Sequence, residues 1–175
     1  MHASRSCLLL ACAALGACRG SAPPPTETAY PGADSIVLER TRCFGSCPAY
    51  RLGVSAAGDV AFTSRGPEDE GRTHRARVPP EAFRSLVTAV ARSGFIALPD
   101  TVAADPALCP LQRTDSPTAT VTVFARSGSR QVVDYQGCAP PADPAAARRV
   151  AALRGLEAAI DSVAGSERWV RPAPR

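Results

Sequence analysis

The positions of the seven cysteines constrain the fold of this chain more than any other feature of its sequence. Three of them fall within or directly after an apolar run at the N-terminus, and four occupy the rest of the chain. Those four are Cys43, Cys47, Cys109 and Cys138. Whether they act as free thiols, metal ligands or disulfides depends on the compartment, because disulfides persist in oxidising environments and are rare in the cytosol.

The first 17 residues are typical of a bacterial lipoprotein signal peptide. A short segment containing Arg5 precedes the apolar run CLLLACAALG. A run of this length is too short to span a bilayer, which takes roughly 20 residues, but it suits the h-region of a signal peptide. The sequence LGAC at 15–18 resembles a lipobox, which implies cleavage before Cys18 and lipidation of its thiol. The alternative is an ordinary secretory signal that is cut nearby.

The resemblance to a lipobox also implies where the protein resides. A diacylglyceryl group on Cys18 would attach the chain firmly to membrane lipid, because each buried methylene contributes ~0.8 kcal/mol. Arg19, rather than an aspartate, follows the cysteine. We therefore expect a lipid-anchored protein of the cell envelope, on the periplasmic side of the outer membrane if the host has two membranes.

Composition divides the remaining chain into a tether, a domain and a tail. Residues 18–34 are rich in Pro, Gly, Ser, Thr and Ala, which predicts a flexible tether. We expect residues 35–170 to form one domain, since a chain of ~150 residues can bury roughly 70% of its surface. Residues 171–175 are expected to be a disordered tail.

In an exported protein the four remaining cysteines predict two disulfides, for which three connectivities are possible. We favour Cys43 with Cys47 and Cys109 with Cys138. The three intervening residues, Phe-Gly-Ser, keep the first pair close together.

The residue pattern of the domain predicts two groups of strands, each followed by a helix. Short apolar or alternating segments at 35–40, 50–54 and 60–64 are typical of strands, and 72–78 predicts an edge strand. A second hairpin is expected from TATVTVFA and RQVVDY around residues 126–129. Apolar residues at helical spacing predict helices from about 80 to 92 and from Pro144 to Gly165, the second capped by Asp143. This order indicates an α+β fold, with an antiparallel sheet built from hairpins and two amphipathic helices packed on one face.

The composition removes several classes of chemistry. All 20 basic residues are Arg, so Schiff-base catalysis, Ser-Lys dyads and a Walker-type phosphate lysine have no candidate residue. The formal net charge of +4 is spread along the chain, and we expect no nucleic-acid partner. No motif indicates a catalytic residue or a bound cofactor, and His74 is the only histidine that would remain after cleavage.

Two alternatives for the first cysteine pair involve chemistry. A thiol-redox site normally has Cys-x-x-Cys at a helix N-terminus, which lowers the pKa of the thiol, whereas here three residues intervene and a strand is expected to follow. A copper or zinc site could use Cys43 and Cys47 together with His74, because such sites take three or four ligands. His74 can equally be an ordinary residue of an Arg-rich edge strand.

Three motifs carry a resemblance to a family of bacterial exported and lipoprotein domains of unknown function. They are C-F-G-S-C-P-A-Y at 43–50, T-D-S-P at 114–117 and E-R-W-V at 167–170. The resemblance covers most of residues 35–170 and implies an α+β envelope domain, without catalytic residues to transfer. The family pattern does not include Cys109 and Cys138, which supports pairing them with each other.

The stretch from Cys43 to Tyr50 is the candidate functional segment. Gly45 permits a tight turn between the paired cysteines, and Pro48 fixes the entry to the next strand. The resulting loop is either structural or a binding surface for an envelope protein, with Phe44 at its tip. The residues expected to form such a surface are Phe44, Gly45, Ser46, Pro48 and Tyr50.

Overall fold

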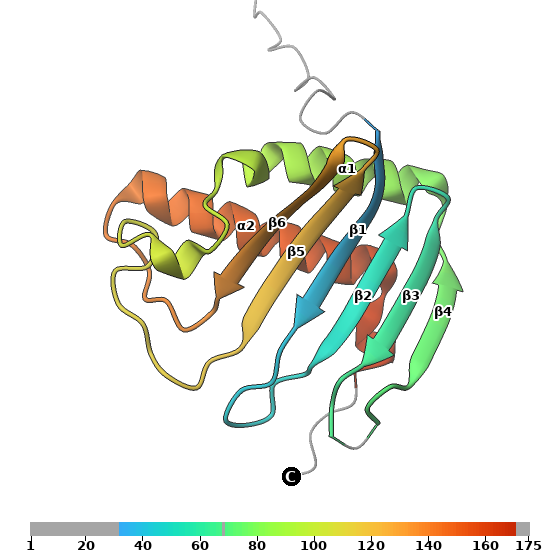
Figure 1. Ribbon diagram of the computed structural model, residues 1–175, viewed down its shortest axis with the longest axis horizontal. Coiled ribbons are helices and arrows are strands. Elements are labelled where there is room, and N and C mark those ends of the chain that lie inside the picture. The colour runs from blue at the N-terminus through green and yellow to red at the C-terminus, as the bar shows by residue number, and fades with distance from the viewer. Residues whose placement is uncertain (1–31, 68, 171–175) are drawn as a thin grey trace, which may run out of the picture.

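The computed structural model describes residues 32–67 and 69–170 (Figure 1). The predicted signal peptide, Cys18, the tether up to residue 31 and the tail at 171–175 lie outside the described residues. In chain order, the elements are β1 (Ala33–Arg40), β2 (Tyr50–Ser55), β3 (Asp59–Ser64), β4 (Thr73–Arg77), α1 (Pro80–Arg92), η2 (Phe95–Ala97), η3 (Val102–Ala104), β5 (Thr118–Ala125), β6 (Gly128–Tyr135), α2 (Pro144–Ala164) and η4 (Ser166–Arg168).

The six strands form one antiparallel sheet in the order β4-β3-β2-β1-β5-β6. Strand β1 lies in the middle, because the chain returns after β4 and α1 to add β5 on the other side of β1. Figure 1 shows α1 and α2 behind the sheet, on the same face. The predicted α+β fold with two layers is therefore confirmed.

The core lies between the sheet and the two helices. Alternation places one side of each strand toward the helices, so that Leu38 of β1 stands between Leu52 of β2 and Val121 of β5 in the register. The helices contribute apolar stripes that face the sheet. Their buried large residues are Phe83, Leu86 and Val90 of α1 and Val150, Leu153, Leu156 and Ile160 of α2.

The ends of the second helix follow the predicted signals. The Asp143 carboxylate accepts a hydrogen bond from the Ala146 amide at 2.7 Å, which caps the N-terminus. Gly165 ends the helix in the left-handed conformation, with φ of 62°. Among the described residues, no helix is both long and apolar enough to cross a membrane.

The two edges of the sheet differ in how they are covered. Strand β4 is an edge strand, as predicted, and carries the exposed Arg75 and Arg77, which discourage edge-to-edge pairing. At the opposite edge, the Val133 amide donates to the Asp100 carbonyl at 2.8 Å, and Thr101 forms a parallel bridge with Val133. The segment before β5 therefore protects the β6 edge.

Two details differ from the prediction. Strand β1 begins at Ala33 rather than at residue 35, because Ala33 pairs with Ala125 through the backbone and needs no apolar side chain to do so. The segment 101–117, for which the residue pattern predicts neither helix nor strand, contains the 3₁₀ helix η3 and buries Val102 and Leu108 in the core. A single 3₁₀ turn is too short to produce a periodic pattern in the sequence.

Candidate functional site

Residues 41–49 connect β1 to β2 and are named the cysteine loop here. Cys43 and Cys47 are joined by a disulfide, with their Cα atoms 5.5 Å apart, as favoured from the sequence. Gly45 has a backbone φ of 147°, a conformation that residues other than glycine rarely adopt. The Phe44 side chain is 92% exposed. The disulfide thus closes a small ring that holds a large apolar side chain in solvent.

The segment 113–118 braces the cysteine loop on one side. The Thr41 amide donates to the Thr118 carbonyl at 2.9 Å, and the Thr118 amide donates to the Thr41 hydroxyl at 2.8 Å. The Phe44 amide donates to the Asp115 carbonyl at 3.1 Å. Asp115 lies in the left-handed region with φ of 62°, which aspartate tolerates better than most residues. The C-F-G-S-C-P and T-D-S-P motifs, far apart in sequence, therefore lie side by side.

The bracing segment is itself held by the second disulfide and by a close contact at Gly137. The Cys109–Cys138 disulfide, with Cα atoms 5.0 Å apart, closes the chain around 110–137. The Arg113 amide donates to the Gly137 carbonyl at 2.9 Å, and the Tyr135 hydroxyl donates to the Arg113 carbonyl at 2.5 Å. A Cβ at position 137 would lie 2.5 Å from the Arg113 carbonyl oxygen, so only glycine fits there. The second disulfide therefore supports the loop that contains the first.

Arg42 braces the cysteine loop on its other side. Its Nε and Nη2 atoms donate to the Arg65 carbonyl at 2.9 and 2.7 Å, just beyond β3. Its Nη2 also lies 3.3 Å from a Glu70 carboxylate oxygen in the β3–β4 turn. Side chains this exposed form weak ion pairs, so the contact to the backbone carbonyl is the more important of the two.

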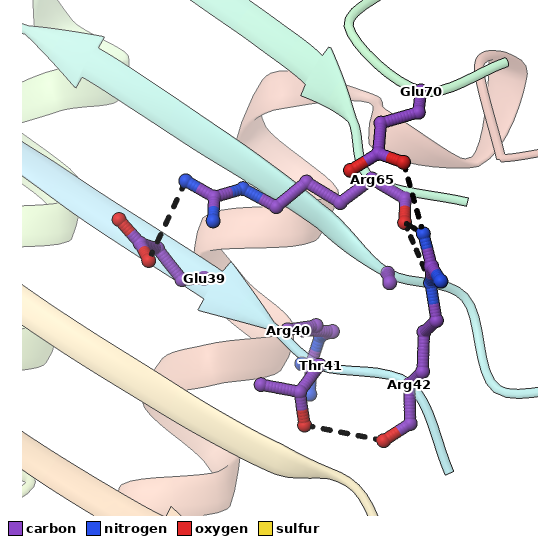
Figure 2. Close-up of a pocket in the computed structure, with 7 residues that line it drawn as sticks. Glu39, Arg40, Thr41, Arg42, Arg65 and Glu70 are labelled. Atoms are coloured by element: carbon purple, nitrogen blue, oxygen red, sulfur yellow. Dashed lines mark hydrogen bonds and ion pairs between the residues drawn. The ribbon is translucent and has the colours of Figure 1, made fainter. Parts of the chain in front are cut away.

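A pocket of about 470 Å³ lies beside the loop, where β1 and β3 end (Figure 2). Figure 2 shows Arg65 extending toward Glu39, while Arg42 reaches the Arg65 carbonyl and Glu70. The residues that line it are Glu39, Arg40, Thr41, Arg42, Ala49, Arg65 and Glu70. Arg65 pairs with Glu39, and Arg42 pairs with Glu70, so the charges of these two arginines are partly compensated by the lining itself.

The base of the cysteine loop is tied to α2. Arg40 and Tyr50 are the last residue of β1 and the first of β2, and they face each other in the register. The Arg40 Nη2 lies 2.9 Å from an Asp161 carboxylate oxygen, and the Tyr50 hydroxyl donates to the other oxygen at 2.6 Å. Burial, together with the hydrogen bond to Asp161, raises the pKa of the Tyr50 phenol, so it remains a protonated donor. Asp161 also accepts from the Ser166 hydroxyl at 2.7 Å.

A second carboxylate, Glu157, lies deeper under the loop and is only 1% exposed. Its Oε2 accepts from the Arg40 Nη1 at 3.3 Å and from the Gln136 Nε2 at 2.9 Å. Burial, together with the negative charge of Asp134, raises the pKa of Glu157 to about 7. Asp134 is fully buried and pairs with the Arg154 Nε at 2.9 Å. Charged groups thus fill part of the space between the sheet and α2.

The structure places His74 away from the two candidate thiols. Its imidazole stacks on the Trp169 indole, with ring centroids 5.6 Å apart, and lies 6.1 Å from the Phe62 ring. No group of three or more His, Cys, Asp or Glu side chains within residues 32–67 and 69–170 is arranged to hold a metal ion. The structure therefore does not bring Cys43, Cys47 and His74 together as ligands.

The expected members of the binding surface divide into two groups. Phe44, Gly45, Ser46 and Pro48 are all exposed on the loop. Tyr50 is only 3% exposed, because the alternation of β2 turns it toward the helices. Tyr50 consequently supports the loop from below and is not available to a partner.

A comparison with known families gives a match over most of the described domain. A family described as a domain of unknown function, DUF6438, matches residues 34–160. The chain belongs to the DUF6438 family. The matched part of this DUF6438 domain includes the cysteine loop, both disulfides and most of α2. A search of curated proteins gives no match.

The groups that tie the loop of this DUF6438 domain to α2 were not among the predicted site residues. The signal was present at Glu157, which lies among Leu153, Leu156 and Ile160 on the apolar stripe of a predicted helix. An ionisable residue at such a position is buried only with partners. Its position therefore indicates a buried polar network, although the partners in β1, β2 and β6 cannot be named without the sheet order.

Proposed function

We propose that this DUF6438 domain is a non-catalytic binding module of the bacterial cell envelope, and that the cysteine loop is its recognition element. The observation that carries the proposal is the exposure of Phe44 on a loop that is otherwise fixed. Aromatic side chains are enriched among the few residues that dominate binding energy. Transfer of this apolar ring from water into a partner pocket would favour binding.

The fixed loop favours binding, because its backbone is already ordered and loses little conformational entropy when a partner binds. The disulfide, the contacts to 113–118 and the Arg42 contact to residue 65 hold the backbone before any partner arrives. Preorganisation of this kind lowers the entropy cost of association. We propose an envelope protein as the partner, with an apolar pocket that receives the phenyl ring of Phe44 and a rim that contacts Ser46 and Pro48.

Photo-crosslinking in the host tests this proposal. With benzoylphenylalanine at position 44, irradiation should give one discrete adduct to an envelope protein, because the ring would lie inside the partner. The matched control is the same substitution at Phe124, a 37% exposed phenylalanine of β5. Equal labelling from both positions, or a ladder of unrelated adducts from position 44, would contradict the proposal.

We further propose that Cys18 carries the lipid that keeps the domain at the membrane, on the strength of the LGAC sequence at 15–18. Replacing Cys18 by Ser should release the protein into the soluble envelope fraction, because thioether lipidation needs the cysteine thiol. Fractionation and intact-mass measurement of the N-terminal peptide check this result. A wild-type protein that is already soluble and lacks acyl mass would contradict it.

A further inference from the structure

The two ends of the cysteine loop rest on a buried cluster of charged groups. Arg40 and Tyr50 contribute from the loop ends, and the rest come from β6, the residue that follows it and α2. The charged groups that act on Glu157 directly are Arg40 of β1, Asp134 of β6 and Arg154 of α2, and the neutral Gln136 donates to it. Tyr50 of β2 and Asp161 of α2 join the cluster through Arg40. Two arginines therefore face three carboxyl groups, and the fully ionised cluster has one negative charge in excess.

This cluster is not fully satisfied. Among the described residues, three buried atoms have no hydrogen-bond partner: Asp134 Oδ1, Arg154 Nη2 and Glu157 Oε1. Native proteins leave few buried polar atoms unpaired, so each one that remains calls for an explanation. A proton on Glu157 would remove the excess negative charge and convert one carboxylate oxygen into a donor.

We propose that Glu157 acts as a proton-operated clamp on the cysteine loop, in which the ionised carboxylate holds Arg40 and proton uptake releases it. This rests on the proposed function of the loop as a binding surface. The proton comes from solvent and is transferred to the Glu157 carboxylate without any other bond changing. Arg40 then loses one of its two ionic partners and keeps Asp161, so the β1 end of the loop becomes less tightly held.

The contacts explain why the effect reaches the loop and not only the core. Arg40 immediately precedes Thr41, whose amide and hydroxyl fix the loop to Thr118. The Arg40 Nε also donates to the Tyr50 hydroxyl at 3.0 Å, so the two ends of the loop share one network. A change at Glu157 therefore acts on both ends of the loop, three residues away from each paired cysteine. Because the pKa of Glu157 is about 7, the change falls near neutral pH.

Protonation of Glu157 is expected to affect the stability of the domain and the mobility of the cysteine loop differently. A proton on Glu157 stabilises the folded domain, since it removes a buried charge next to Asp134. The same proton weakens the hold on Arg40, so the loop is expected to become more mobile as the pH falls. A role of Glu157 in stability alone would not loosen the loop under conditions that stabilise the domain.

NMR spectroscopy of the protein, purified as its host processes it, tests the clamp. Amide shifts and relaxation rates of residues 41–47 should titrate between pH 5 and 9 with a midpoint near 7, with more mobility on the acid side. In Glu157→Gln, which is neutral at every pH, the loop should show the mobile behaviour throughout. Because histidines also change charge in this range, His74→Gln serves as the control and should titrate like the wild type.

The clamp is overturned if the loop amides do not titrate, if they titrate in Glu157→Gln as in the wild type, or if His74→Gln abolishes the titration. These outcomes are separable from those of the proposed function. A titrating loop together with position-independent crosslinking would leave the clamp and remove the binding role. A loop that does not titrate, together with a specific adduct at position 44, would overturn the clamp and leave the binding role.

Discussion

The free energy of unfolding is expected to fall by roughly 3 kcal/mol as the pH rises from about 4.5, the ordinary pKa of a glutamate, to about 7, the pKa of Glu157 in the folded domain. Between these values the folded domain keeps a proton on Glu157 that the unfolded chain has lost. Stability therefore decreases with pH across this interval and levels off above it. Urea unfolding at pH 5, 6, 7 and 8 measures the change.

Two variants test whether Glu157 is the source of this pH dependence. Glu157→Gln removes the titrating group and keeps a similar shape, so its free energy of unfolding should vary much less across the interval. Glu81→Gln removes an exposed glutamate from the first turn of α1 and should leave the wild-type profile between pH 5 and 8 unchanged. A wild-type profile that is flat, or that keeps its slope in Glu157→Gln, would show that the buried carboxyl is not the source.

Of the two disulfides, Cys109–Cys138, which closes the larger ring, should contribute more to the free energy of unfolding. Replacing Cys109 and Cys138 together by Ala is expected to cost roughly 3.5 kcal/mol, against about 2 kcal/mol for Cys43 and Cys47, from loop-closure entropy in the unfolded chain. Cys109 and Cys138 are also buried, whereas Cys43 and Cys47 are half-buried, so lost packing adds to the difference. Denaturant unfolding of the two double variants compares them.

The gap of about 1.5 kcal/mol corresponds to a few degrees in Tm for a domain of this size. Equal losses in the two double variants would contradict the ring-size argument. If the Cys43/Cys47 variant is nearly as stable as the wild type but no longer crosslinks through position 44, the smaller ring serves the loop and not the fold. Addition of zinc or copper to the reduced protein provides a further check, because a rise in Tm in the wild type but not in the Cys43/Cys47 variant would support a metal site at this pair.

Local signals were sufficient for most of the fold. The helix from Pro80 to Arg92 and the capped helix from Pro144 follow from side-chain spacing and from proline and aspartate at their first positions. The hairpins follow from alternation and turn residues. The central position of β1 could not be predicted, because it depends on how β5 returns after α1, and no local pattern encodes that connection.

The same division applies to the candidate site. The exposed Phe44 and the two disulfides were predictable, since both depend on residues close in sequence or on the number of cysteines. The contacts that hold the loop in place were not predictable. They join Arg40 of β1 to Asp161, the Phe44 amide to the Asp115 carbonyl, and the Arg42 side chain to the Arg65 carbonyl. Contacts between segments this far apart appear only once the strand order is known.

The exposed position of Phe44 leads to one decisive comparison. The protein crosslinked through position 44 is identified by mass spectrometry and purified, and its Kd is measured for the wild type, for Phe44→Ala and for Phe124→Ala. If the loop is the recognition element, Phe44→Ala should weaken binding by roughly 30-fold or more, the loss typical of a dominant interface residue, and Phe124→Ala should bind like the wild type. Equal Kd values for wild type and Phe44→Ala would contradict the account.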